Sequence, residues 1–399
     1  MSEQRKIRVA VVFGGRGPEH PVSVMGGGNM LSAIDRSKYD VIAVGITTDG
    51  HWVQVADEPG RMAITDGELP TVAAIAMPGA QIVPWAGGRG AGSGLAGPAS
   101  AAGPIASAPA QIPHLFGDVD VVLPVLHGPY GEDGTIQGLL EMAGVRYVGA
   151  GVLASAVSMD KEYMNIIFAA KKLPVGPYVV VKERDWPAAG ADPVLATTGQ
   201  ATPEHKRVLD EIAELGWPLF VKPARGGSSI GTSKARDIGE LYDAVAVARQ
   251  YDSKVLVEAA IDGVEIEVSV LEGADGGPPE TSLPGQLLVD GGEEFWDFEA
   301  KYLDTASGMA IPAPIPDSAI AEVRRLAAAA FEAVSCEGLA RVDFFYTPDG
   351  RVIINEINTM PGLSPASYWQ KMWEATGKTF PELIDRLPQS ALSKRPGLR

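Results

Sequence analysis

The stretch RVDFFYTPDGRVIINEINTMPG, residues 341–362, constrains the fold of this chain more than any other segment. Two apolar runs flank the Pro-Asp-Gly at 348–350, which favours a tight turn, so the sequence predicts an antiparallel hairpin. Residues two apart in a strand point to the same face. By this rule one face carries four polar side chains: Arg341, Asp343, Glu356 and Asn358. An arginine, two carboxylates and an amide on so apolar a hairpin indicate either a solvated face or a binding site.

The polar face has the donors that a hard cation prefers. Mg²⁺ takes oxygen ligands, often one or two carboxylates together with substrate phosphates. Asp343, Glu356 and Asn358 could supply these oxygens, and Arg341 lies beside them for an anionic group. The alternative is an ordinary solvated face, since alternating polar residues are usual on half-exposed antiparallel sheets. Such a face would more often carry Lys and Thr, so we favour the metal site.

Length and charge limit the class of protein. The chain has 399 residues, enough for two or three domains with their own cores. Its net charge of -17 disfavours a nucleic-acid partner, because phosphate backbones are bound by clustered Lys and Arg. A single cysteine, Cys336, excludes an internal disulfide and a Cys-rich zinc site. No apolar run approaches the roughly 20 residues of a membrane span, and the N-terminus lacks a signal-peptide pattern. We therefore expect a cytoplasmic protein with no membrane partner.

The first part of the chain alternates strand-like and helix-like segments, which is typical of an open, mostly parallel α/β sheet. KIRVAVVF (6–13) and DVVLPVLHG (120–128) predict buried strands that run into glycine-rich turns. Ligands in such sheets bind beyond the carboxyl ends of strands. Glu19 and His127, which follow the two strands, are therefore binding candidates.

The segment after His127 also predicts a helix boundary. Asp133 is a plausible N-cap and Gly144 a plausible end of the helix between them. Helix capping explains both Glu132 and Asp133 without any function. A different composition appears at 87–110, which is almost entirely Gly, Ala, Pro and Ser. We predict a flexible insertion near 79–112, with a shorter loop of the same kind at 187–201.

From about residue 160 the pattern changes to α+β. In TPEHKRVLDEIAELG the sequence predicts a helix with Thr202 as N-cap and Gly216 as its end, and Asp237 starts another. PLFVKPARGGSSIG predicts a strand that ends at Lys222 and enters a glycine-serine loop. A lysine beside such a loop can hold phosphates, through its point charge and backbone N–H groups. Taken alone, this loop is better explained as a simple flexible turn.

Two further segments leave alternatives open. KVLVEAAIDGVEIEVSVLEG predicts two strands joined near 262–263, with Glu258 and Glu265 flanking the junction. These glutamates could read a nucleotide's amino group and ribose hydroxyls, or be surface charges. EEFWDFEAKYLD (293–304) predicts either a packed irregular loop or a lid that brings Lys301 and Tyr302 to a reaction centre.

Taken in order, six segments resemble the D-alanine–D-alanine ligases of the ATP-grasp superfamily. They are FGGRGPEHPVSV, LHGPYGEDGTIQGLLE, VKPARGGSSIG, EFWDFEAKYL, GLARVDFF and INEINTMPGLSPAS. The resemblance implies an α/β N-terminal substrate-binding domain with an open, mostly parallel sheet at 1–159. It further implies two α+β lobes that form an ATP-grasp, a central lobe at 160–264 and a C-terminal lobe at 265–399 with the metal and catalytic residues.

The resemblance also implies a reaction. The carboxylate of one D-alanine attacks the γ-phosphate of ATP to give an acyl phosphate, and the amine of a second D-alanine then attacks that carbonyl. The product, D-alanyl-D-alanine, is a precursor of peptidoglycan and hence of the cell wall. We expect ATP as co-substrate, two Mg²⁺ ions with Mn²⁺ as an alternative, a homodimer and a cytoplasmic location.

By the same resemblance the site residues have roles at ATP and the metals. Asp343, Glu356 and Asn358 would hold the metal ions. The expected ATP-binding residues are Lys161, Lys222, Lys301 and Ser228 at the phosphates, Glu258 near the adenine and Glu265 at the ribose.

Other residues would act on the amino acids. Arg341 and the Gly362 N–H would stabilise the tetrahedral oxyanion, as preorganised donors do. Glu19 would hold the first substrate's ammonium with His127 close by, and Ser367 would meet the second substrate's carboxylate. In addition, the hydrogen-bonded set that would close the lid consists of Glu19, Ser228 and Tyr302.

Departures from the family pattern concern both substrates. Gly17 and Pro21 replace the usual Ser and a small or polar residue near the first substrate, and Tyr368 and Trp369 are bulkier than the usual walls of the second-substrate pocket. The intact EAKYL favours an amine as second nucleophile. The alternatives are a same-fold ligase for D-lactate, D-serine or another amine, and a non-catalytic nucleotide-binding regulator.

Overall fold

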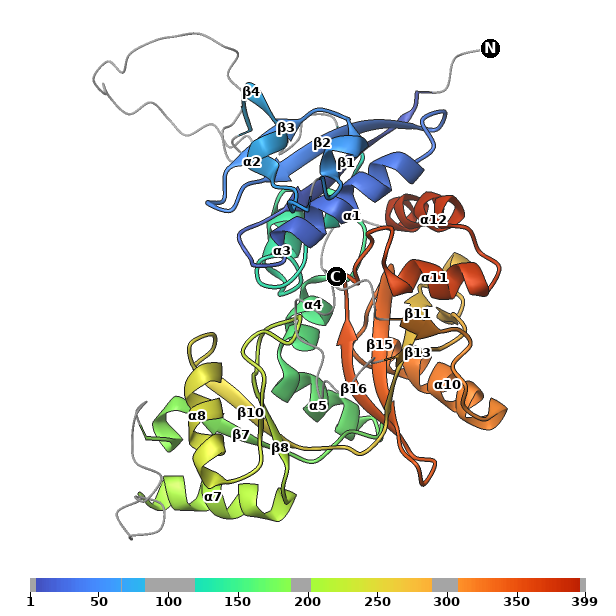
Figure 1. The fold of residues 1–399 in the computed structure, drawn as a ribbon. Coiled ribbons are helices and arrows are strands. Elements are labelled where there is room, and N and C mark those ends of the chain that lie inside the picture. The colour runs from blue at the N-terminus through green and yellow to red at the C-terminus, as the bar shows by residue number, and fades with distance from the viewer. Residues whose placement is uncertain (1–4, 66, 83–118, 188–201, 289–307, 395–399) are drawn as a thin grey trace, which may run out of the picture.

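The computed structural model describes residues 5–65, 67–82, 119–187, 202–288 and 308–394 (Figure 1). The predicted insertion beyond residue 82, most of the loop at 187–201, and Lys301 with Tyr302 lie outside the described residues. The described strands form three sheets of six, four and six strands. No helix in the described part of the chain is long and apolar enough to cross a membrane.

The N-terminal sheet is open and mostly parallel, as predicted. Its strand order is β4-β3-β2-β1-β5-β6, and β1 pairs in parallel with both β2 and β5. The strands are β1 (Ile7–Gly14), β2 (Tyr39–Ile46), β3 (Trp52–Val55), β4 (Ala76–Ile82), β5 (Val121–Val125) and β6 (Arg146–Tyr147). The accompanying helices are α1 (His20–Ala33), η1 (Pro59–Met62), α2 (Val72–Ile75) and α3 (Thr135–Met142).

Both faces of this sheet are buried, as parallel sheets require. Val11 and Phe13 of β1 pack on the side of α1, in a buried cluster that also contains residues of two C-terminal helices, α11 (Tyr368–Ala375) and α12 (Phe380–Ser393). Val12 points the other way and packs with α3. Helix α12 lies beside α1 and contacts β5 and β6, so the last helix of the chain packs against the N-terminal domain (Figure 1).

The central sheet is antiparallel, with the order β7-β10-β8-β9 and helices α7 and α8 packed into its core. The elements are β7 (Tyr178–Lys182), η2 (Glu183–Asp185), α7 (Pro203–Leu215), β8 (Leu219–Pro223), β9 (Ser233–Ala235), α8 (Ile238–Ala248) and β10 (Lys254–Ala259). Both predicted helix starts here are confirmed, because the Thr202 side chain accepts from His205 N and that of Asp237 from Glu240 N.

The C-terminal sheet has the order β14-β13-β11-β15-β16, with β12 paired to β11. Its elements are β11 (Val264–Leu271), η3 (Ala274–Gly276), β12 (Glu280–Thr281), β13 (Gly285–Leu288), β14 (Gly308–Ala310), α10 (Asp317–Ala333), β15 (Leu339–Tyr346) and β16 (Val352–Asn358). Helix α10 packs in the core of this sheet together with α4 (Val152–Met159) and α5 (Lys161–Ala170). The two strands predicted around 262–263, β10 and β11, belong to different sheets, so their link carries the chain from one lobe to the other.

Two local predictions are wrong. The helix predicted to start at Asp133 begins at Thr135, with Gly134 at the N-cap in the left-handed region (φ +92°). Asp133 accepts from the N–H groups of Tyr130 and Thr135, both at 2.9 Å, one position before the cap. Trp369 does not form a wall of the substrate pocket. It is fully buried, and its Nε1 donates to Ala340 O at 3.0 Å, because α11 turns this side chain into a core cluster that contains residues of both the N-terminal and the C-terminal sheets.

Candidate active site

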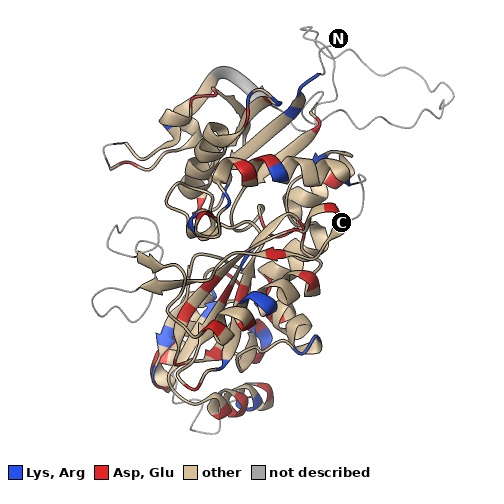
Figure 2. Cartoon of the chain, turned by 90° about the vertical axis from the view of Figure 1, so that its right-hand side faces the viewer, with Lys and Arg blue, Asp and Glu red and all other residues tan. Residues whose placement is uncertain are grey.

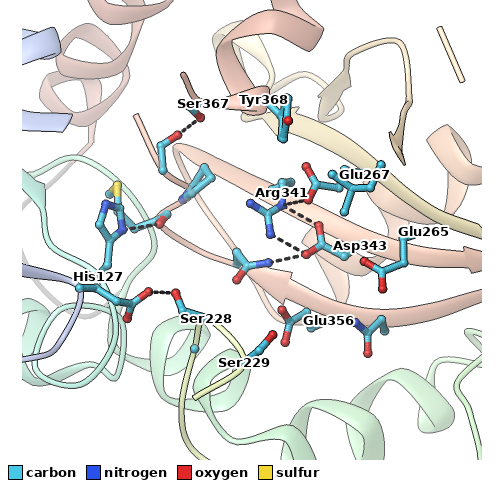
Figure 3. Close-up of a pocket in the computed structure, with 18 of the residues that line it drawn as sticks. His127, Ser228, Ser229, Glu265, Glu267, Arg341, Asp343, Glu356, Ser367 and Tyr368 are labelled. Carbon is cyan, nitrogen blue, oxygen red and sulfur yellow. Dashed lines mark hydrogen bonds and ion pairs between the residues drawn. The ribbon is translucent and has the colours of Figure 1, made fainter. Parts of the chain in front are cut away.

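One cavity of about 1400 Å³ lies where the three sheets meet. Every predicted site residue that the structure describes lines it. Glu19 and His127 follow strands β1 and β5 of the N-terminal sheet. Ser228 comes from the central lobe, and Arg341 and Glu356 come from the C-terminal hairpin (Figure 3). The sequence therefore identified one shared site from segments more than 300 residues apart.

The polar face of the hairpin points into this cavity. β15 and β16 pair antiparallel, which places Arg341 opposite Asn358 and Asp343 opposite Glu356. Arg341 donates two hydrogen bonds of 2.7 Å to Asp343, and Asn358 Nδ2 donates to the same carboxylate at 3.0 Å (Figure 3). The solvated-face alternative is thereby wrong, because these side chains are at most partly exposed inside a cavity.

Two lysines bring positive charge to the same cavity and each meets a glutamate. Lys161 Nζ lies 3.1 Å from Glu356 and donates to Gly226 O at 2.9 Å. Lys222 Nζ lies 2.6 Å from Glu258. Burial alone would lower the pKa of Lys161, but Glu356 and the other nearby carboxylates outweigh it and raise that pKa. Lys and Arg lie among Asp and Glu in all parts of the described chain (Figure 2), and the cavity likewise contains both signs of charge.

The glycine-serine loop contacts the N-terminal domain at Glu19, the N-cap residue of α1. Ser228 and Ser229 both have positive φ, +51° and +57°, which is uncommon for residues with side chains. The Ser228 hydroxyl donates a hydrogen bond to Glu19 Oε1. This loop therefore lines the cavity and contacts the N-terminal domain through Ser228.

His127 is buried with a defined tautomer. Its Nδ1 lies 3.0 Å from Met360 O, and a carbonyl only accepts, so Nδ1 carries the proton. Burial lowers the pKa of His127, against the opposing charge of Glu19, and favours the neutral ring. The Nε2 atom is then an acceptor, and it has no hydrogen-bond partner among the described residues. A ligand N–H or O–H would satisfy it.

Sequence reasoning missed two carboxylates of the cavity. Glu132 was attributed to helix capping, but its oxygens accept from Gly128 N and Met360 N, so that interpretation is wrong. Glu267 lies opposite Asp343 on β11, with Oε1 3.4 Å from Arg341 Nε. The two-residue alternation of a strand could have identified Glu267, because it follows Glu265 by two residues and lies on the same strand face.

The hairpin donors fit a hard cation. Asp343 and Glu356 are carboxylates, and Asn358 adds an amide oxygen because its nitrogen is the atom bonded to Asp343. No group of three His, Cys, Asp or Glu side chains suited to a metal occurs in the described ranges. Two carboxylates and one amide oxygen supply only part of an octahedral ligand set, so Mg²⁺ at this face would take its other ligands from water and substrate phosphates.

Known proteins resemble this chain along its whole length. Two family models match, D-ala D-ala ligase N-terminus at residues 8–150 and D-ala D-ala ligase C-terminus at residues 167–389. A D-alanine–D-alanine ligase of Streptomyces griseus is 51% identical over 396 residues, which cover 99% of this chain and 95% of that protein. One of Kineococcus radiotolerans is 49% identical and covers 100% of both chains.

Solved structures show the same similarity. The D-alanine-D-alanine ligase from Coxiella burnetii has a TM-score of 0.72 and 29% identity, covering 98% of this chain and 95% of that chain. The VanG D-Ala:D-Ser ligase from Enterococcus faecalis also has a TM-score of 0.72, with 27% identity, covering 97% of this chain and 100% of that chain.

Proposed function

The chain belongs to the D-alanine–D-alanine ligase family, and we propose that it uses ATP to join two D-alanine molecules into D-alanyl-D-alanine for peptidoglycan synthesis. One observation carries this proposal. The hydrogen bond between Ser228 and Glu19 brings a glycine-rich phosphate-type loop to a carboxylate of the N-terminal domain, inside the cavity that also contains the polar hairpin face. An amino acid held by Glu19 would thus lie beside the phosphates of ATP.

The first step is phosphoryl transfer from ATP to the first D-alanine, whose carboxylate oxygen attacks the γ-phosphorus while ADP leaves. Such transfer needs alignment and charge neutralisation more than covalent help. Lys161 and Lys222 would bind phosphate oxygens, together with Lys301 outside the described residues. Glu258 would lie at the adenine and Glu265 at the ribose. Two Mg²⁺ ions, or Mn²⁺, held by Asp343, Glu356 and Asn358 would neutralise phosphate charge when bound.

The second step joins the amino acids. The amine of the second D-alanine attacks the acyl phosphate carbon, and inorganic phosphate leaves. Arg341 and the backbone N–H of Gly362 would donate to the oxyanion that forms on the carbonyl oxygen. Glu19, with His127 Nε2 as a neutral acceptor beside it, would hold the first ammonium. Ser367 would receive the second carboxylate.

The proposed function assigns a role to each of three domains. We propose an N-terminal substrate-binding domain at 1–159, a central ATP-grasp lobe at 160–264 and a C-terminal lobe at 265–399. Tyr302 would complete a lid set with Glu19 and Ser228. The homodimer and the cytoplasmic location stay predictions.

The second substrate needs its own test, because a D-Ala:D-Ser ligase has the same fold as this chain. We would incubate the protein with ATP, Mg²⁺ and D-alanine, alone or with D-serine or D-lactate, and separate the products by mass. D-alanyl-D-alanine as the main product supports the proposal. A main product with D-serine or D-lactate would move the assignment to that acceptor, and ATP binding without any product would favour the regulator.

A further inference from the structure

Glu132 makes two backbone contacts that join distant parts of the chain. Its Oε2 accepts from Gly128 N at 2.9 Å, and its Oε1 accepts from Met360 N at 3.0 Å, across 228 positions of sequence. Neither N–H belongs to α3, the helix that follows. The carboxylate therefore bridges the loop after β5 to the segment after β16.

The same loop also binds the carbonyl group of Met360. His127 Nδ1 donates to Met360 O at 3.0 Å, so both the N–H and the C=O of Met360 are bound by side chains of the 127–132 loop. Met360 is only 7% exposed. Buried peptide groups that lose such partners cost free energy, because water cannot replace them.

The segment held in this way carries groups of the second reaction step. Gly362, two residues after Met360, has the N–H proposed for the oxyanion, and Ser367 Oγ donates to Gly362 O. A second tether comes from α1, where Asn29 Nδ2 donates to Leu363 O at 2.8 Å. Although this segment follows a strand of the C-terminal sheet, side chains of the N-terminal part of the chain position it.

We propose that Glu132 is a positioning residue of the ligation step, which fixes the 360–362 segment and its oxyanion donor against the first-substrate site. The inference rests on the proposed function. Both oxygens of the Glu132 carboxyl group keep lone pairs that can accept an N–H group, whether the group is ionised or protonated, whereas a glutamine has one acceptor oxygen and would turn an NH₂ group toward the other N–H. A displaced Gly362 N–H would weaken amine attack while leaving phosphoryl transfer, which uses the lysines and the hairpin, largely intact.

The test is Glu132→Gln with Asp133→Asn as the matched control, since Asp133 is the adjacent carboxylate and contacts only its own loop and helix start. For each purified protein we would measure dipeptide formation, the KM for ATP, and acyl phosphate trapped with hydroxylamine. We expect dipeptide formation by Glu132→Gln to fall about 100-fold, as loss of one oxyanion donor does. Trapped acyl phosphate and the KM for ATP should stay within about two-fold, and Asp133→Asn should behave as wild type.

The outcomes separate this inference from the proposed function. Wild-type protein that forms no dipeptide would remove the proposed function itself. Normal dipeptide formation by Glu132→Gln, or an equal loss of trapped acyl phosphate and dipeptide, would overturn the positioning role alone. If Glu132→Gln does not fold, Glu132→Asp decides by the same ratio of dipeptide formed to acyl phosphate trapped, because its shorter side chain keeps the carboxyl group but cannot span both N–H groups.

Discussion

Ser228 Oγ donates a hydrogen bond to Glu19 Oε1, which joins the glycine-serine loop of the central lobe to the start of α1 in the N-terminal domain. The loop is shaped for this contact. Ser228 adopts a φ of +51°, and a Cβ atom on Gly227 would lie 3.4 Å from Glu19 Oε2. The carboxylate that would receive the first ammonium therefore takes its orientation from the loop that would hold phosphate.

Replacing Ser228 by Ala removes this hydrogen bond and keeps the backbone preference. Hydrogen bonds to charged groups contribute about 1.5–3 kcal/mol, so we expect the KM for the first D-alanine to rise at least about ten-fold, with a lower kcat. Steady-state kinetics with varied D-alanine measures both. Ser37→Ala, which removes an exposed contact to Asp35, is the control. A Ser228→Ala enzyme with wild-type constants would contradict the role of this bond.

Glu356→Gln tests the metal-ligand assignment. The change keeps the size of the side chain but removes the charge that faces Lys161 and the proposed metal. Loss of even an outer partner of a metal site lowers affinity or activity about 10–100-fold, so we expect dipeptide formation to fall by at least 100-fold. The Mg²⁺ concentration for half-maximal rate should also rise. Asp349→Asn, in the turn of the same hairpin, should leave both unchanged. Near-normal activity of Glu356→Gln at low Mg²⁺ would remove Glu356 from the ligands.

The sequence was informative wherever the signal is local. The polar face of the hairpin follows from two-residue alternation around one turn, and the caps at Thr202 and Asp237 follow from side-chain chemistry within three residues. The grouping of these residues into one site came from the resemblance of six segments, in order, to one family. No local pattern in the sequence indicates that Glu19 and Ser228 are in contact.

Contacts set by tertiary packing were missed. Glu132 looks like a helix-start carboxylate, and only the folded chain brings Met360 N to it. Trp369 follows Tyr368 in a pocket-like motif, yet the helix turns it into the core while Tyr368 lines the cavity. Neighbours in a helix point about 100° apart, so the start of α11 had to be known before either side chain could be placed.

Lys222→Met tests the ATP site. Lys222 lies near the end of β8, with Nζ 2.6 Å from Glu258. The residue is only 9% exposed, so solvent cations would not easily replace its positive charge if it were removed. We expect the KM for ATP to rise at least about ten-fold, the effect of losing roughly 1.4 kcal/mol of binding. The KM for D-alanine should change little. Lys182→Met, on the exposed end of β7, is the control. An equal rise in the KM values for ATP and D-alanine would count against a phosphate-specific role.

The pH dependence of stability tests the surroundings of Glu132. Burial, followed by the charge of Glu19, raises the pKa of Glu132 to about 8 from its ordinary 4.5. Between these two values the folded protein holds a proton that the unfolded chain has lost. Raising the pH through this range therefore favours unfolding: the stabilising contribution is full below pH 4.5 and absent above about pH 8.

We expect the unfolding free energy of the ligand-free wild type, relative to that of Glu132→Gln, to fall steadily from pH 5 to pH 8. Urea unfolding of both proteins at several pH values measures this difference. The pKa of His127 is lowered by burial, so its titration makes the folded protein more stable as pH rises. Because His127 is present in both proteins, its contribution cancels in the difference between them. A difference that stays constant with pH would mean that Glu132 is already ionised at pH 5, and that its two N–H contacts outweigh burial and the neighbouring carboxylates.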